Sequence, residues 1–226
     1  MTALDTPVVA APASRPRKIY LAAEYALLFF VAVGVYYLIG RGTSPIPLLL
    51  VLGVGVVVYL VRQKGFDRGA FWRAAAVPGQ LRSILVMWLL AAILATAVVT
   101  VFLPDNLFGF PAGEPLMWGL VMVLYPLASV YPQELIFRGF LFHRYAPVFG
   151  SGTGLVAASA TAFGFVHIIF GNWISVVLSF LGGWLFALRY LRTRSLLAAS
   201  VEHALYGMLV FTVGLGQFFF HGAVQT

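Results

Sequence analysis

Residues 83–103 read SILVMWLLAAILATAVVTVFL, an apolar run without a charged side chain. About 20 consecutive apolar residues are enough for an α-helix to cross the hydrocarbon core of a bilayer. Comparable runs, separated by Gly, Pro or charged residues, occupy residues 19–39, 46–61, 115–142, 152–171, 173–191 and 195–220. The sequence therefore predicts an all-α, polytopic transmembrane helical bundle with about seven spans and room for an eighth.

The composition of the whole chain supports this prediction. Of its 226 residues, 62% are apolar and only 9% are charged, whereas soluble domains are near half apolar and a quarter charged. This composition excludes a soluble globular fold. The chain contains no Cys, so disulfides, thiolate metal sites and Cys nucleophiles are also excluded. Any chemistry must come from His, Glu, Asp or hydroxyl groups.

The basic residues of the chain indicate its orientation. There are 14 Lys and Arg against 7 Asp and Glu, a net charge of +7. With the N-terminus in the cytoplasm, every basic residue except Arg41 and Arg138 falls in a predicted cytoplasmic segment, as the positive-inside rule requires. We therefore expect an integral multi-pass protein of a prokaryotic inner or plasma membrane. The bilayer, and not nucleic acid, accounts for the positive charge.

Three regions follow from this topology. Residues 1–18, rich in Ala and Pro, are predicted to be a disordered cytoplasmic tail. Residues 19–114 are predicted to hold the N-terminal transmembrane helices. Within them, the basic and aromatic segment near 62–82 fits either a short helix at the headgroup level or a solvated loop. Residues 115–226 form the third region, which contains most of the polar groups inside predicted spans.

Ionisable side chains inside a span cost several kcal/mol unless they are paired or hydrated, so each is a functional candidate. The predicted spans contain Glu134, Arg138, His167, Glu202 and His203, with Glu24 near one end of the first span. Glu134 and Arg138 are four residues apart, on one helix face, and are expected to pair. Such a pair could also serve only to hold helices together. Gln133 lies about 100° around the helix from Glu134 and faces a different neighbour.

The combination of Glu134, His167 and His203 is more informative than any one of them. A single His in an apolar helix is more often a hydrogen-bonded packing residue than a ligand. An acid and two imidazoles together can polarise water, bind a divalent metal or shuttle protons. Their predicted depths in the membrane agree to within about two helical turns, which permits a shared site.

Two further features are predicted to be structural. Asn172, in the turn between two predicted spans, is expected to cap the helix that follows it. The pair Gly182 and Gly183 is expected to allow close packing between helices.

The motifs QELIFR (residues 133–138), FGFVH (163–167) and EHALYG (202–207) resemble, in this order, those of the CPBP family of intramembrane proteases. The family includes the type II CAAX prenyl endopeptidases and many bacterial immunity-type membrane proteins. The resemblance covers about residues 115–221 and implies that residues 115–226 form a CPBP-like protease core.

The resemblance also implies roles for single positions. The family's first motif, two glutamates and an arginine, corresponds to Gln133, Glu134 and Arg138. Its second motif corresponds to Phe163 and His167. In the family, the first glutamate and the second-motif histidine are thought to activate water.

The third motif, His with Asn four residues later, corresponds to His203 and Gly207, and in the family these two residues stabilise the oxyanion. The chain therefore departs from the family pattern at two positions. Gln133 can orient water but cannot accept its proton. Gly207 lacks an oxyanion donor, and such a loss typically costs a hundredfold or more in rate.

The expected function is an intramembrane endopeptidase acting on a membrane-associated protein or peptide, with or without a prenyl group. In this hypothesis Glu134 and His167 activate the water, and Gln133 orients it. His203 stabilises the oxyanion, and Arg138 holds the glutamate. The resemblance favours a mechanism without metal.

Three alternatives stay open at this stage. Two His and a carboxylate also suit zinc, so Glu134, His167 and His203 form the competing metal site. A weakened or inactive family member could serve as a membrane scaffold or partner protein. A proton-coupled transporter is less well supported, because no inverted repeat is evident. The sequence predicts no particular oligomeric state.

Overall fold

The computed structural model describes residues 14–40 and 43–219, and it builds these residues from helices without any strand. The predicted all-α class is therefore confirmed. Six helices in the described residues are long and apolar enough to cross a membrane: Arg15–Ile39, Pro78–Phe102, Pro115–Phe149, Thr153–Phe170, Trp173–Thr193 and Leu196–Val213. The remaining predicted span corresponds to Ile46–Arg62, an apolar helix of 17 residues. The count of seven and the orientation stay predictions.

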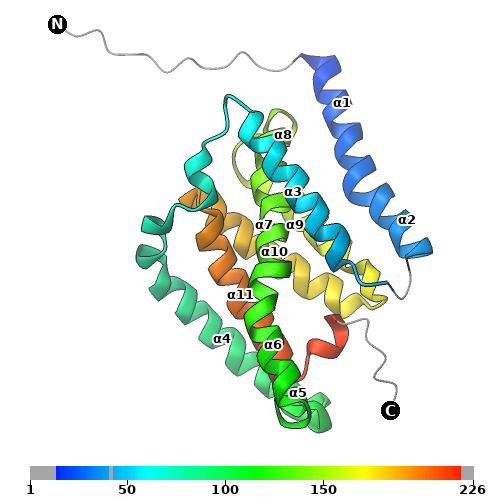
Figure 1. The fold of residues 1–226 in the computed structure, drawn as a ribbon, viewed down its shortest axis with the longest axis vertical. Coiled ribbons are helices and arrows are strands. Elements are labelled where there is room, and N and C mark those ends of the chain that lie inside the picture. The colour runs from blue at the N-terminus through cyan, green and yellow to red at the C-terminus, as the bar shows by residue number, and fades with distance from the viewer. Residues whose placement is uncertain (1–13, 41–42, 220–226) are drawn as a thin grey trace, which may run out of the picture.

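Figure 1 shows the order of the elements along the chain. The α-helices are α1 (Arg15–Ala26), α2 (Ala32–Ile39), α3 (Ile46–Arg62), α4 (Pro78–Phe102), α5 (Gly109–Gly113), α6 (Pro115–Tyr125), α7 (Tyr131–Glu134), α8 (Leu141–Phe149), α9 (Thr153–Val166), α10 (Trp173–Thr193) and α11 (Leu196–Val213). The 3₁₀ turns are η2 (Arg68–Phe71), η3 (Ala74–Ala76), η4 (Pro104–Asn106), η7 (His167–Phe170) and η8 (Gly216–Phe219). The π-helical turns are η1 (Leu27–Val31), η5 (Pro126–Val130) and η6 (Leu135–Phe140).

The helix that carries the first motif is one long rod interrupted by two π turns. Helices α6, α7 and α8 follow one another through η5 and η6 along the length of the molecule (Figure 1). Pro126 opens η5 and Pro132 lies in the short helix between the two turns. Proline lacks the N–H group of a regular helix, and π turns are frequent at functional sites. The departures from regular helix in this rod are thus the π turns on either side of Pro132.

Two ends of the predicted segments are corrected by the structure. Helix α1 begins at Arg15 with Pro16 in its first turn, so the last four residues of the predicted tail are helical. Residues 1–13 of that tail lie outside the described residues. Helix α11 ends at Val213 rather than near residue 220, because Gly214 adopts a φ of +107°. Glycine takes this left-handed conformation readily and commonly ends helices.

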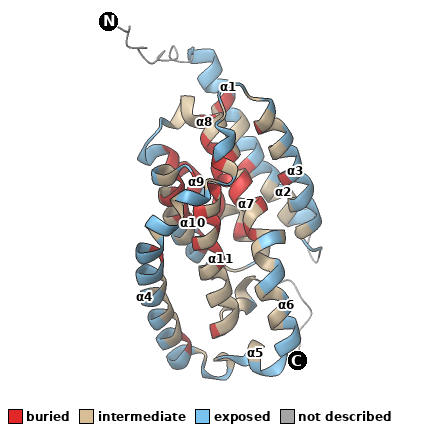
Figure 2. Cartoon of the chain, turned by 60° about the vertical axis from the view of Figure 1, so that its left-hand side comes forward, coloured by how far each residue is buried: buried red, intermediate tan, exposed pale blue. Residues whose placement is uncertain are grey.

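Buried residues concentrate in the second half of the chain. Figure 2 shows them around α7 to α11, whereas α4 is largely exposed. Two glycines allow α9 and α10 to approach closely: a Cβ at Gly164 would lie 2.8 Å from the Cβ of Phe180, and one at Gly183 would lie 2.9 Å from the ring of Phe163. The close packing expected at the Gly182 and Gly183 pair is confirmed for Gly183.

The basic segment near residues 62–82 contains two 3₁₀ turns and the first residues of α4, and its place at the headgroup level stays a prediction. It forms the turns η2 and η3, and its Phe66 and Phe71 pack against the core. The Tyr131 hydroxyl donates a hydrogen bond to the backbone oxygen of Phe71 (2.9 Å). Asp67 caps η2 by accepting from the backbone N–H of Gly69. These contacts fold the segment against the end of the bundle.

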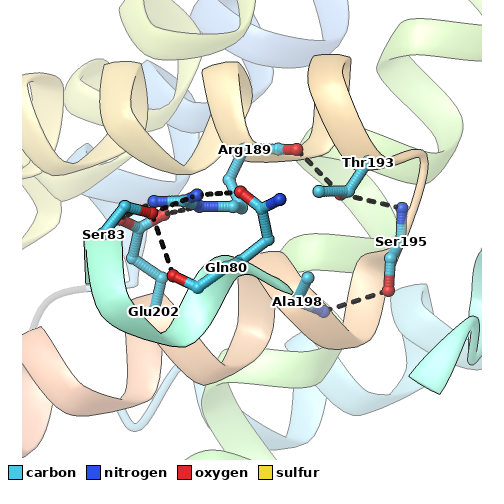
Figure 3. A network of polar contacts seen from close by, with 7 residues as sticks. All are labelled: Gln80, Ser83, Arg189, Thr193, Ser195, Ala198 and Glu202. Atoms are coloured by element: carbon cyan, nitrogen blue, oxygen red, sulfur yellow. Dashed lines mark hydrogen bonds and ion pairs between the residues drawn. The ribbon is translucent and has the colours of Figure 1, made fainter. Parts of the chain in front are cut away.

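A buried polar network ties α4 to α10 and α11 (Figure 3). Arg189 on α10 donates to both carboxylate oxygens of Glu202 on α11, from Nε at 2.9 Å and from Nη2 at 3.0 Å. Its Nη1 also donates to Gln80 and to the Ser83 hydroxyl at the start of α4. Glu202 and Arg189 are almost fully buried, so each provides the counter-charge that the other needs. Glu202 therefore belongs to this network and has a structural role.

Removing one partner of the Arg189–Glu202 ion pair is expected to destabilise the protein. Glu202→Leu should lower the free energy of unfolding by about 3 to 5 kcal/mol, because Arg189 is left buried without its counter-charge. Unfolding by dodecyl sulfate titration in mixed micelles measures the change. The double variant Glu202→Leu/Arg189→Met should recover much of the loss, and Glu114→Gln, at an exposed carboxylate, should change little. A double variant as unstable as Glu202→Leu would contradict the ion-pair interpretation.

Candidate active site

The first motif places an acid and a base in the centre of the bundle. Glu134 ends α7 and Arg138 lies in the π turn η6 that follows, and both side chains are completely buried. The Arg138 Nη1 atom lies 3.1 Å from Glu134 Oε1, which confirms the expected pair. Arg138 also donates from Nη2 to the backbone oxygen of Gly183 (2.9 Å), and its guanidinium lies 4.6 Å from the ring centre of Phe163. These contacts join the first-motif helix to α9 and α10.

The same carboxylate oxygen binds the third-motif histidine. His203 Nδ1 lies 2.8 Å from Glu134 Oε1. The imidazole stacks on Phe186, with ring centres 4.5 Å apart, and its Nε2 lies 3.3 Å from the Tyr125 hydroxyl. A carboxylate held against Arg138 can only accept hydrogen bonds. Nδ1 of His203 therefore carries the proton, and Nε2 is left as an acceptor.

The second-motif histidine has a separate anchor. His167 begins the 3₁₀ turn η7 directly after α9, and its Nδ1 lies 2.7 Å from the backbone oxygen of Phe163. A carbonyl oxygen cannot donate, so Nδ1 carries the proton here as well. Nε2 makes no hydrogen bond within residues 14–40 and 43–219 and is available as an acceptor. The Phe163 ring contacts both imidazoles, at 4.9 Å from His167 and 5.3 Å from His203 between ring centres.

A cavity of about 1660 Å³ lies beside these histidines. Its walls are mostly apolar, and the polar side chains that line it include Tyr125, Ser129, Gln133, His167, Ser179, His203 and Tyr206. Neither Glu134 nor Arg138 lines it. The motif residues therefore divide into a group that faces the cavity and a buried group that supports it.

Gln133 belongs to the group that faces the cavity. Its amide Nε2 donates to the Ser129 hydroxyl at 2.7 Å, which leaves the amide oxygen as an acceptor toward the cavity. Glu134 turns the other way, toward Arg138 and His203, as the rotation of about 100° between consecutive helix residues predicts. The position where the family has its first glutamate thus presents a neutral amide to the cavity.

Sequence reasoning did not single out Tyr125 and Ser129. They precede Gln133 by eight and four residues, and this spacing places polar groups on one face of an otherwise apolar helix. That regular spacing is the feature of the sequence that could have identified Tyr125 and Ser129 as site residues. The contacts of Tyr125 with His203 and Phe211 on α11 are not contained in the local pattern.

The groups expected for a zinc site do not assemble into one. The structure holds no group of three His, Asp or Glu side chains suited to a metal ion among the residues that it describes. Glu134 Oε1 is occupied by His203 Nδ1 and Arg138, whose positive charge disfavours a cation at the same oxygen. The donor set is therefore a poor fit for tetrahedral zinc.

Asn172 takes the structural role predicted for it. Its side-chain oxygen accepts from the backbone N–H of Ser175 at 2.8 Å and caps α10. Its amide nitrogen also donates to the backbone oxygen of Phe218 (2.9 Å), which fixes the chain after α11.

The fold and the motif geometry define a helical membrane protein with a carboxylate–imidazole pair beside an apolar cavity. Residues 111–209 match the family model described as type II CAAX prenyl endopeptidase Rce1-like. This match contains all three motifs and confirms the resemblance to that family for this part of the chain. No curated protein and no solved structure matches the chain.

The tautomers of both histidines can be tested directly. Nitrogen-15 NMR of histidine-labelled protein in lipid bilayers should show protonated Nδ1 and unprotonated Nε2 at His167 and His203 near neutral pH. Glu134→Leu should remove this preference at His203 and leave His167 unchanged, because only His203 depends on the carboxylate. Single His→Gln variants assign the signals. A protonated Nε2 at His203 in the unsubstituted protein would contradict the proposed hydrogen bond.

Proposed function

We propose that the protein is an intramembrane endopeptidase that hydrolyses a peptide bond of a membrane-associated protein whose cleaved segment enters the cavity. The main support is the pair of histidines beside that cavity. Each is fixed through Nδ1, by the Glu134 carboxylate or by the Phe163 carbonyl, so that Nε2 remains the acceptor. An imidazole whose Nε2 is unprotonated can accept a proton from water.

In this mechanism His167 is the general base. A water oriented by the Gln133 amide oxygen attacks the carbonyl carbon, and His167 Nε2 accepts its proton. The carbonyl oxygen becomes a tetrahedral oxyanion. His203 cannot donate to it while its proton is on Nδ1, so this mechanism does not use the oxyanion role that the sequence suggested for His203. When the intermediate collapses, the C–N bond breaks and the same proton passes from His167 to the leaving amine. The products are a carboxylic acid and an amine.

Glu134 has a positioning role in this proposal. The sequence suggested that it takes the proton together with His167, but it is completely buried and does not line the cavity. Its Oε1 instead holds His203, and Arg138 keeps the carboxylate charged. We therefore assign proton transfer to His167 and the orientation of His203 to Glu134.

The substrate proposal rests on the chemistry of the cavity walls. The cavity-lining residues in the described part of the chain include no Asp, Glu, Lys or Arg. An apolar wall of this size binds hydrocarbon better than a charged peptide. We propose a lipid-modified peptide of the prenylated CAAX type as substrate, and we favour hydrolysis without metal.

Removing the proposed base tests the mechanism. His167→Ala should lower kcat for a prenylated reporter peptide by about 10²- to 10⁴-fold, the contribution of a positioned general base. The matched control is His143→Ala, because His143 packs against Tyr59 and Phe66 and does not line the cavity. Cleavage is measured by mass spectrometry with purified protein in nanodiscs.

Two outcomes would contradict the proposal in different ways. Equal loss in both variants would place His167 outside the reaction. Prenylated peptide that binds without being cleaved would identify a non-catalytic binding protein, as the neutral Gln133 in the first motif would allow.

A further inference from the structure

A side chain at the position that follows His203 by one helical turn would have to displace the ring of Tyr125. A Cβ at Gly207 would overlap the hydroxyl oxygen and two ring carbons of Tyr125. Real Cβ atoms essentially never make contacts this short. The phenol of Tyr125 therefore fills the space that a side chain at position 207 would need, and the two residues are sterically complementary.

Tyr125 holds its hydroxyl at the site where such a side chain would act. It is the last residue of α6, immediately before the π turn η5. Its hydroxyl lies 3.3 Å from His203 Nε2, and its ring contacts Phe211 on α11, with ring centres 5.4 Å apart. Tyr125, His203 and Gly207 all line the cavity.

We propose that Tyr125 is a catalytic residue that donates its hydroxyl hydrogen to the oxyanion, in place of a donor at position 207. This inference rests on the proposed peptidase function. Before reaction, the hydroxyl donates to His203 Nε2, the acceptor nitrogen of that ring. The separation of 3.3 Å is long for an O–H donor, so this hydrogen bond is weak.

When the oxyanion forms, it becomes a better hydrogen-bond acceptor for the Tyr125 hydroxyl than His203 Nε2. A negatively charged oxygen accepts hydrogen bonds about twice as strongly as a neutral group. The Tyr125 hydroxyl turns about its C–O bond from His203 Nε2 to the oxyanion and keeps its proton throughout. His203, held by Glu134, places the phenol in the resting site, and Phe211 packs against its ring. No covalent bond to Tyr125 forms or breaks.

A purely space-filling Tyr125 predicts different behaviour. In that case the ring alone matters, and the hydroxyl can be removed without effect on the reaction. If the hydroxyl is the oxyanion donor, its loss must affect the transition state far more than the bound substrate. The two roles are separated by comparing kcat with KM in variants that retain the ring.

The first test removes only the hydroxyl. Tyr125→Phe should lower kcat by about 10²- to 10³-fold, the range for loss of one oxyanion donor, while KM changes about twofold or less. It should weaken binding of a tetrahedral phosphonate analogue in proportion to kcat. The control Tyr190→Phe, outside the cavity at a ring that packs on Phe142, should leave kcat unchanged. Wild-type kcat in Tyr125→Phe would overturn the inference while leaving the peptidase proposal intact.

The second test moves the donor from one helix to the other. Gly207→Asn alone should abolish cleavage, because its side chain collides with Tyr125. Tyr125→Ala opens the space, and Tyr125→Ala/Gly207→Asn should cleave at least tenfold faster than Tyr125→Ala, since the amide supplies a donor. Melting temperatures in detergent identify variants that fail to fold. A folded double variant no faster than Tyr125→Ala would contradict the exchange, and an inactive wild-type protein would overturn both proposals together.

Discussion

The bundle depends on one buried carboxylate oxygen. Glu134 Oε1 contacts the Arg138 guanidinium and His203 Nδ1 in a region where neither Glu134 nor Arg138 is exposed. A charged group in such surroundings is tolerated only with a partner, so the sequence must keep these groups together. Arg138 extends the arrangement to the backbone of Gly183. The same interactions thus hold α7, α10 and α11 together and determine which nitrogen of His203 remains free.

The site contains residues that line the cavity and buried residues that hold them in place. Gln133 faces the cavity and Glu134 faces the protein, because adjacent helix residues point about 100° apart. The acid does not line the cavity and contacts it only through His203. Gly207 and Tyr125 show a similar exchange between helices, because a side chain missing from α11 is matched by a ring from α6. The polar inner wall of the cavity is consequently built from three separate segments of sequence.

Local sequence patterns were sufficient for some of these features and insufficient for others. The span lengths, the pairing of Glu134 with Arg138 and the Asn172 cap follow from interactions within one helix or one turn. The contact between Glu134 and His203 joins residues 69 positions apart. The spacing of residues along one helix shows which of them share a face, but it does not show which other helix that face contacts. The π turns η5 and η6 add further rotation around Gln133 that an ideal helix does not predict. The packing of Phe66 and Phe71 from the segment near 62–82 against the core is likewise not contained in the local pattern.

The coupling between Glu134 and His203 gives the most direct measurement of the central claim. In a double-mutant cycle on kcat, with folding verified for every variant, Glu134→Gln, His203→Ala and the combined variant are compared with the unsubstituted protein. If Glu134 acts through His203, the combined loss should be no larger than the loss in His203→Ala alone. Losses that multiply would show that Glu134 contributes independently of His203 and would contradict the assignment of the carboxylate as a positioning group.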